Sequence, residues 1–309
     1  MIQSPMDTLK NFPVRKTKAQ KEAFRKAVVR YLTDQGYTCR EETGSFGCVN
    51  ILAGDPEKAK YLVTAHYDTP AGMPIPNLIT PCNLFTFLLY QALVVVLMLG
   101  LMGAAFGLLL LATGNENLSI LISYLFLWVL IGLMMFGPAN PSNANDNTSG
   151  VVSVLEIAAS LPEAHRERVC FVLFDLEEAG LVGSAAYRKA HKAATEHQIV
   201  LNLDCVGDGN EIALFPSKKL CKDREKMLHL CKCVGRYGAK TISVIHKGFR
   251  YYPSDQKNFP LGVGIAAFNR KKYVGLYCDK IHTAKDTVLD ETNINLLRAA
   301  LSSLISPDE

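Results

Sequence analysis

The stretch 169–180, VCFVLFDLEEAG, joins an apolar run to two adjacent glutamates and a glycine. The β-branched and aromatic side chains of Val169–Phe174 predict a buried strand, and Gly180 favours a turn after it. Glutamates are mostly exposed, so Glu177 and Glu178 taken alone indicate a solvated loop. The segments on either side of this strand decide whether the pair has a further role.

Predicted strands and helices alternate along the whole chain. This alternation predicts an α/β fold, with a mixed, mostly parallel central sheet and helices on both of its faces. The other predicted strands are residues 38–42, 48–53, 61–66, 199–204, 211–215, 241–246 and 263–267. The predicted helices are residues 18–36, 147–161, 181–197, 220–237 and 292–305.

Two long apolar segments interrupt the alternation. Residues 84–112 and 118–137 contain no charged side chain. At about 1.5 Å per helical residue they would span roughly 43 and 30 Å, and the core of a bilayer is about 30 Å thick. We therefore expect two transmembrane helices that contact the lipid bilayer. Two helices buried in a soluble core are the alternative.

The charge pattern orients these two helices. The short linker TGNEN makes them a hairpin whose flanks emerge on one side, and all 33 Lys and Arg residues lie outside it. Because positively charged segments stay cytoplasmic, we expect an integral protein of the plasma membrane whose soluble part faces the cytoplasm. The nine cysteines show no disulfide-framework spacing, which fits that side. The hairpin is residues 81–137, and one α/β domain combines residues 1–80 with 138–309.

Acidic and histidine residues recur at predicted strand ends, where the ligand sites of open α/β sheets gather. Each such residue alone is weak, because a strand-end aspartate is usually a cap or turn residue. Together they supply two histidines and several carboxylates, the nitrogen and oxygen ligands that suit zinc and similar divalent metals. They are His66 and Asp68 in YLVTAHYDTP, Asp146 in NANDNTSG, Glu177 and Glu178, Asp204 in IVLNLDCVGDG, and His282 in KIHTAKDT.

The order of these motifs resembles metallopeptidase family 28. The set His-x-Asp, Asp-Asn-x-Ser-Gly, Glu-Glu-x-Gly-x-x-Gly-Ser, Asp and His runs from His66 to Asp286, and SDQKNFPLGVGIAAF at 254–268 is also similar. This family contains co-catalytic zinc aminopeptidases and carboxypeptidases, and its fold is related to that of glutaminyl cyclases. The resemblance implies a zinc-aminopeptidase-like catalytic domain, a peptide substrate and two divalent metal ions, with zinc the leading candidate. No nucleic-acid partner is expected.

Carried over by position, the resemblance implies a role for each metal ligand. His66 and Asp204 would hold one metal ion. Glu178 and His282 would hold the second. Asp146 would bridge both ions, because a shared carboxylate keeps two metals at the short separation that such sites need.

The remaining roles concern proton transfer and positioning. Glu177 would be the general base that takes a proton from water and passes it to the leaving amine. Asp68 would orient His66 by accepting the proton of its other ring nitrogen. Tyr251 or Tyr252 could donate a hydrogen bond to the oxyanion of the transition state.

These roles predict a membrane-anchored, metal-dependent exopeptidase, specifically an aminopeptidase. A single-zinc cyclase or amidohydrolase on the same fold is one alternative. A non-catalytic membrane adaptor is another, although no expected ligand is missing here. A transporter is disfavoured, because the apolar helices carry no ionisable residue along their length. The hairpin lies between the His66 and Asp146 segments, which predicts a site close to the membrane surface.

Overall fold

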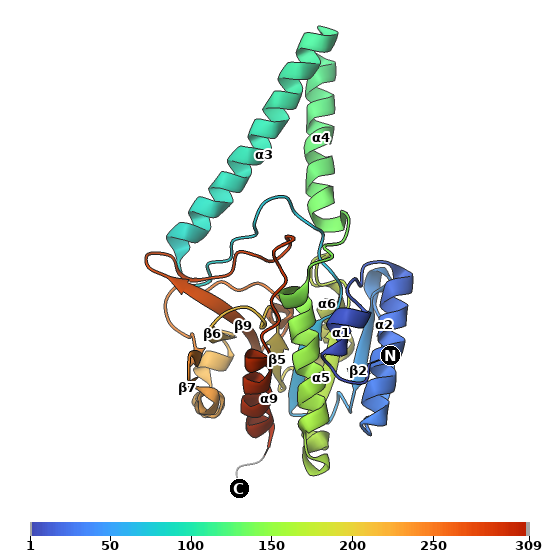
Figure 1. The fold of residues 1–309 in the computed structure, drawn as a ribbon, viewed down its shortest axis with the longest axis vertical. Coiled ribbons are helices and arrows are strands. Elements are labelled where there is room, and N and C mark those ends of the chain that lie inside the picture. The colour runs from blue at the N-terminus through green and yellow to red at the C-terminus, as the bar shows by residue number, and fades with distance from the viewer. Residues whose placement is uncertain (1, 307–309) are drawn as a thin grey trace.

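A computed structural model of the protein describes residues 2–306, which form one ten-stranded mixed sheet with helices packed against it (Figure 1). Nine strands follow the order β1-β2-β4-β3-β5-β9-β6-β8-β7, and β10 pairs with β9. The strands are β1 (Cys39–Thr43), β2 (Val49–Ala53), β3 (Tyr61–His66), β4 (Val169–Phe174), β5 (Ile199–Leu203), β6 (Glu211–Pro216), β7 (Gly235–Tyr237), β8 (Lys240–Val244), β9 (Gly262–Lys271) and β10 (Gly275–Tyr277).

The centre of the sheet is parallel. Strands β4, β3, β5 and β9 are neighbours that run in the same direction, whereas β1, β2, β6 and β7 each form antiparallel pairs. Every residue of β3, β4 and β5 is buried, as expected for parallel strands that are covered on both faces. The predicted α/β fold with a mixed sheet is therefore confirmed, and the parallel strands bring their carboxyl ends to one edge.

Helices cover the two faces of the sheet through two separate apolar clusters. Tyr61, Val63 and Ala65 of β3 join α2 (Lys18–Asp34), α5 (Gly150–Ser160) and α9 (Glu291–Ile305) in the larger cluster. Leu62, which points the opposite way, packs with Tyr187 of α6 (Val182–Ala190) in the smaller one. The remaining short helices are α1 (Asp7–Asn11), α7 (Lys192–Thr195) and α8 (Arg224–Leu230).

Two predicted helices are shorter than the sequence pattern indicated. The helix expected over residues 220–237 reduces to α8 between two 3₁₀ turns, because the last residues instead form β7 and pair with β8. Gly238, with φ of +63°, supplies the turn between these strands. The helix expected over residues 181–197 breaks at His191, whose backbone is non-helical and whose two ring nitrogens contact Glu57 and Glu42.

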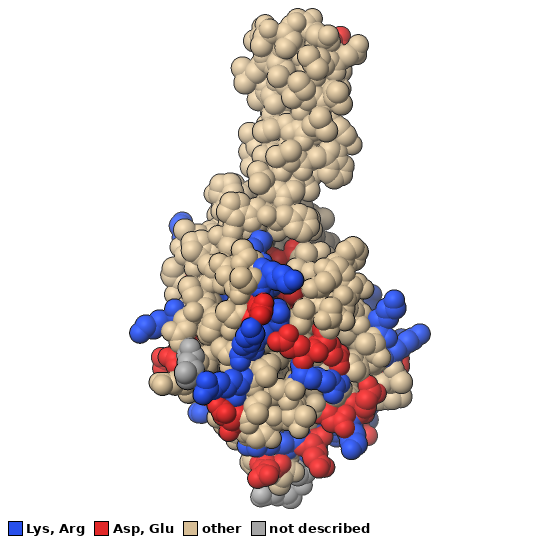
Figure 2. Space-filling model, turned by 90° about the vertical axis from the view of Figure 1, so that its right-hand side faces the viewer, with Lys and Arg blue, Asp and Glu red and all other residues tan. Residues whose placement is uncertain are grey.

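Helices α3 (Leu84–Thr113) and α4 (Glu116–Phe136) form a hairpin that projects from the domain (Figure 1). None of the α3 side chains is buried, so the alternative of two core helices within this chain is wrong. Both helices are long and apolar enough to cross a membrane. Figure 2 shows charged side chains over the globular part of the visible face and almost none on the projection.

The segments that lead into and out of the hairpin, residues 70–72 and 138–140, pair with each other at its base. The N–H of Gly72 donates to the carbonyl of Pro138, and the N–H of Asn140 donates to that of Pro70, both at 2.9 Å. The ends of the hairpin therefore lie side by side, in the connection between β3 and α5. Ends that lie close together let a long segment leave a domain without separating the elements on either side of it.

Candidate metal centre

The predicted site residues converge at the carboxyl edge of the parallel strands. His66 is the last residue of β3, Glu177 and Glu178 lie in the turn after β4, and Asp204 follows β5. Two further residues come from outside the sheet. Asp146 lies in the segment Ala144–Ser149 that precedes α5, and His282 in the loop after β10. The strand order therefore places β4, β3 and β5 side by side with their acidic ends together.

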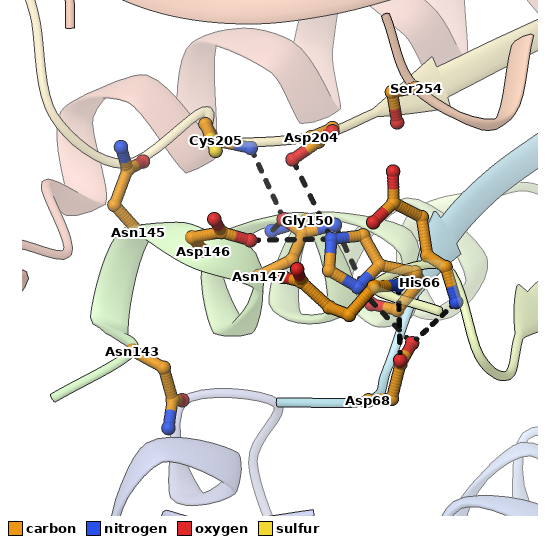
Figure 3. Close-up of polar contacts among 12 residues, drawn as sticks. His66, Asp68, Asn143, Asn145, Asp146, Asn147, Gly150, Asp204, Cys205 and Ser254 are labelled. Carbon is orange, nitrogen blue, oxygen red and sulfur yellow. Dashed lines mark hydrogen bonds and ion pairs between the residues drawn. The ribbon is translucent and has the colours of Figure 1, made fainter. Parts of the chain in front are cut away.

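Asp146 lies between the two histidines. Its Oδ1 is 3.3 Å from Nε2 of His66, and its Oδ2 is 3.0 Å from Nε2 of His282. Asp204 approaches His66 at 3.7 Å, and Glu178 approaches His282 at 3.6 Å. Figure 3 shows Asp146 and Asp204 pointing toward His66 from two different elements. The ligand atoms form three groups that could each hold a metal ion. Two of them, His66–Asp146–Asp204 and Asp146–Glu178–His282, share Asp146, and the third is His66–Glu177–Glu178. The two groups that share Asp146 are called the two triads below.

The donor atoms of the two triads fit divalent metal ions. Within each triad the ligand atoms lie within 4.8 Å of one another. Oδ1 of Asp204 is buried and accepts no hydrogen bond from any residue in the described range 2–306. A buried carboxylate oxygen of that kind is costly unless a cation satisfies it. Imidazole nitrogen and carboxylate oxygen are the ligands that zinc accepts.

The electrostatics of the site also favour a bound cation. Burial raises the pKa of Glu178 to about 8 and holds that of Glu177 well above its ordinary value. Burial opposes the charged form of His282, yet the carboxylates of Glu178 and Asp146 outweigh it and raise the pKa of His282 to about 9. The two buried glutamates therefore hold protons that a metal ion would displace. For Asp146, in contrast, burial favours the protonated form, but the hydrogen bonds of His282 and His66 outweigh burial and lower the pKa.

Asp68 lies beside the ring nitrogen that it is predicted to orient, and it has two further contacts. Its Oδ1 lies 3.4 Å from Nδ1 of His66, without the alignment of a hydrogen bond, so the orienting role stays a prediction. Asp68 also accepts the backbone N–H of Glu177 at 3.0 Å and that of Glu178 at 3.3 Å. One carboxylate thus links the end of β3 to the turn that carries both glutamates, and it fixes where their side chains begin.

Three supporting residues were missed by the sequence analysis. Asp286 accepts the backbone N–H groups of Asn145 and Asp146 at 2.7 and 3.0 Å. Asn147 accepts from the N–H of Gly150 and of Cys205, which ties the Asp146 segment to the end of β5. These bonds hold the backbone on either side of the shared carboxylate.

The third supporting residue is Arg15, which is fully buried. It donates to the carbonyl of Tyr67 at 2.5 Å and to the hydroxyl of Thr148 at 3.1 Å. Its guanidinium therefore joins the segment after His66 to the segment after Asp146. A fully buried arginine is rare without partners of this kind.

Asp255 is a further acid that the predicted site lacked. It is completely buried, and neither of its carboxylate oxygens accepts an aligned hydrogen bond from a residue in the described part of the chain. Burial raises its pKa to about 7. Its charge also acts on Glu177, whose pKa it helps to raise. The motif SDQKNF contains Asp255, but nothing in the motif reveals its burial.

A cavity of about 360 Å³ opens over the site, and both predicted tyrosines line it. The hydroxyl of Tyr252 donates to the backbone carbonyl of Asp204 at 2.9 Å, so its proton is already engaged. Tyr251 is half-exposed, and its ring lies 5.2 Å from that of Phe87 on α3. A role for either hydroxyl toward an oxyanion stays a prediction.

Comparisons with known proteins place the chain in a family. The family model described as Peptidase family M28 matches residues 133–304. A glutaminyl cyclase from Porphyromonas gingivalis is 17% identical over 97% of this chain and 96% of that chain, with a TM-score of 0.61. The LapA aminopeptidase of Legionella pneumophila is 16% identical over 99% and 70%, with a TM-score of 0.58. At these identities the likeness shows the fold alone. No curated protein sequence matches this chain.

The support of Asp146 by Asp286 predicts an effect on metal affinity. Asp286→Asn replaces one of two acceptor oxygens by an NH₂ group that faces a backbone N–H. We expect zinc affinity to fall about 10- to 100-fold, as for other residues that orient metal ligands. Titration against a chelator measures it. Asp208→Asn, which removes a carboxylate paired with Lys280 at 2.8 Å, is the matched control. Equal affinities for the two variants would contradict a positioning role for Asp286.

Proposed function

Because the chain belongs to peptidase family M28, we propose that it is a metal-dependent exopeptidase, and specifically an aminopeptidase that uses two metal ions. The family and the aminopeptidase with a similar fold support a hydrolase. The observation that carries the finer proposal is the pair of ligand triads that share Asp146. A complete set of ligands on both sides of one carboxylate is what a two-metal site requires.

His66, Asp204 and Asp146 would hold one ion, and Asp146, Glu178 and His282 the other. Bound there, divalent ions supply a polarised carbonyl and a water whose pKa is lowered to about 7. Glu177 belongs to neither of the triads that share Asp146, although it forms a third possible group with His66 and Glu178. With the ions held by the two triads, its carboxylate would accept a proton from the attacking water and deliver that proton to the leaving nitrogen.

The acidic floor of the cavity suits a substrate with a free amino terminus. Asp146, Glu177, Glu178 and Asp204 line the cavity. No lysine or arginine occurs among the described residues that line the cavity. With Asp146, Glu178 and Asp204 engaged by metal ions, Glu177 would remain as the carboxylate that an α-ammonium group could meet. The lack of a basic side chain to pair with a terminal carboxylate favours an aminopeptidase over a carboxypeptidase.

The proton-transfer role of Glu177 is testable by an isosteric change. Glu177→Gln removes the base but leaves both triads intact, so we expect turnover of aminoacyl p-nitroanilides to fall at least about 10²-fold with zinc content unchanged. Metal analysis of the same sample provides the control. Loss of zinc together with activity would contradict the assignment. Cyclisation of N-terminal glutamine by a wild-type protein that binds one zinc ion would instead identify a cyclase.

We further propose that α3 and α4 anchor the enzyme in a membrane, with the catalytic domain on the cytoplasmic side. Both helices are long and apolar enough to span a bilayer, and none of the α3 side chains is buried. All 33 Lys and Arg residues lie outside the hairpin, and such residues stay cytoplasmic. An enzyme in this position would act on peptides at the inner surface of the membrane.

Cysteine labelling tests this topology with an internal control. Glu116→Cys places a thiol at the hairpin tip, whereas the native Cys231 is exposed on the catalytic domain. In intact cells, a membrane-impermeant maleimide should label position 116 and leave Cys231 unlabelled until the cells are permeabilised. Labelling of Cys231 alone would reverse the orientation. Labelling of both sites in intact cells would contradict a membrane-spanning hairpin.

A further inference from the structure

The cavity over the metal ligands has two unlike walls. One wall is the acidic floor described above. The other comes from the segment leading into the hairpin and from α3, and its residues are Asn77, Leu78, Ile79, Thr80, Phe87 and Gln91. The hairpin and the segment before it therefore contribute directly to the cavity in which the peptide bond would be cleaved. Leu78, Ile79 and Phe87 give this wall an apolar part.

Two further cavities continue this apolar wall along α3. The first, about 390 Å³, shares Leu78 with the catalytic cavity and runs beside Tyr90, Val94 and Leu97. The second, about 290 Å³, shares Leu97 with the first and reaches Leu101 on α3 and Leu130 on α4. Of the described residues that line these two cavities, only Asp279 is charged.

The α3 residues in this series fall on one side of the helix. Phe87, Gln91, Val94, Leu97 and Leu101 follow one another at intervals of three or four, the spacing of a single helical face. From Phe87 to Leu101 this face extends about 21 Å at the rise of an α-helix. Seven residues of an extended peptide would cover about 23 Å. We call this face and its two cavities the α3 track.

We propose that the α3 track binds the apolar part of the substrate, so that the enzyme selects peptides whose residues beyond the scissile bond are apolar. This inference rests on the proposed aminopeptidase function. The amino terminus would lie on the acidic floor, and the following residues would extend along the α3 track toward α4. The catalytic cavity and the first cavity of the track share Leu78, which supports an occupant that is part of the same molecule. The track carries no charge apart from Asp279, which supports an apolar occupant.

The segments before α3 and after α4 also contact the loop that carries His282. The N–H of Met73, which lines the cavity between α3 and α4, donates to the carbonyl of His282 at 2.7 Å. The side-chain amide of Asn140, which follows α4, donates to the carbonyl of Thr283 at 3.0 Å. The track and the metal site are therefore parts of one connected structure.

Two tryptophan substitutions on α3 separate the α3 track from the lipid-facing surface. Val94 lines the track, whereas Val96 is 66% exposed and lines none of the three cavities. Val94→Trp should block the track, and Val96→Trp adds the same side chain to the same helix outside it. Two heptapeptides serve as substrates, each with the same first two residues, followed by either five apolar or five polar residues. Measurements use full-length protein in lipid nanodiscs with zinc.

We expect Val94→Trp to lower kcat/KM for the apolar peptide about tenfold, a loss of about 1.4 kcal/mol, and to leave the polar peptide unchanged. Val96→Trp should change neither. Because both variants meet the same lipid and the same substrate partitioning, a difference between them reports the track. Equal effects of the two substitutions, or an equal loss for both peptides, would overturn the proposal.

A crosslinking measurement separates failure of this inference from failure of the proposed function. The apolar peptide, carrying a photoreactive diazirine at its last residue, is bound to Glu177→Gln protein, and adducts are mapped by mass spectrometry. Adducts at residues 94–101 would support the α3 track, whether or not wild-type protein hydrolyses the peptides. Such adducts together with no hydrolysis of either peptide would refute only the peptidase. Hydrolysis with adducts scattered over the outer faces of α3 and α4 would refute the track alone. Neither hydrolysis nor adducts would refute both.

Discussion

The architecture depends on holding one carboxylate, that of Asp146, between two histidines. Its oxygens lie 3.3 and 3.0 Å from His66 and His282, which come from parts of the chain more than two hundred residues apart. Nothing local could fix such an arrangement. The parallel sheet sets the position of His66, Asp286 holds the backbone of Asp146, and Asn147 ties that segment to the end of β5. Burying several carboxylates together costs desolvation free energy, and a bound cation would offset that cost.

In the proposed enzyme, the hairpin would set which substrates are selected and would leave the metal chemistry unchanged. It lies in the connection between β3 and α5, and its first helix contributes to one wall of the cavity. In a soluble protein such an apolar wall would be an exposed hydrophobic patch. Placed at a membrane, the same wall would be a surface that favours apolar substrates. Anchoring and specificity would then come from the same helices.

The sequence was sufficient where chemistry and local pattern coincide. The strand ending at Phe174, the paired glutamates and the histidines all stand in short motifs, so both the α/β fold and the members of the two triads were predictable. Asp286, Arg15 and Asp255 were not, because their roles come from burial and from contacts with residues distant in sequence. The same holds for β7, since only pairing with β8 makes Gly235–Tyr237 a strand instead of the end of a helix.

The most direct test of this account is an anomalous diffraction measurement at the zinc absorption edge, on crystals of the protein grown with zinc. The shared position of Asp146 predicts two peaks, one on the side of His66 and Asp204 and one on the side of Glu178 and His282, separated by about 3.5–4 Å. A single peak beside His282, with His66 and Asp204 bound to no metal at saturating zinc, would contradict the two-metal site from which the proposed chemistry follows.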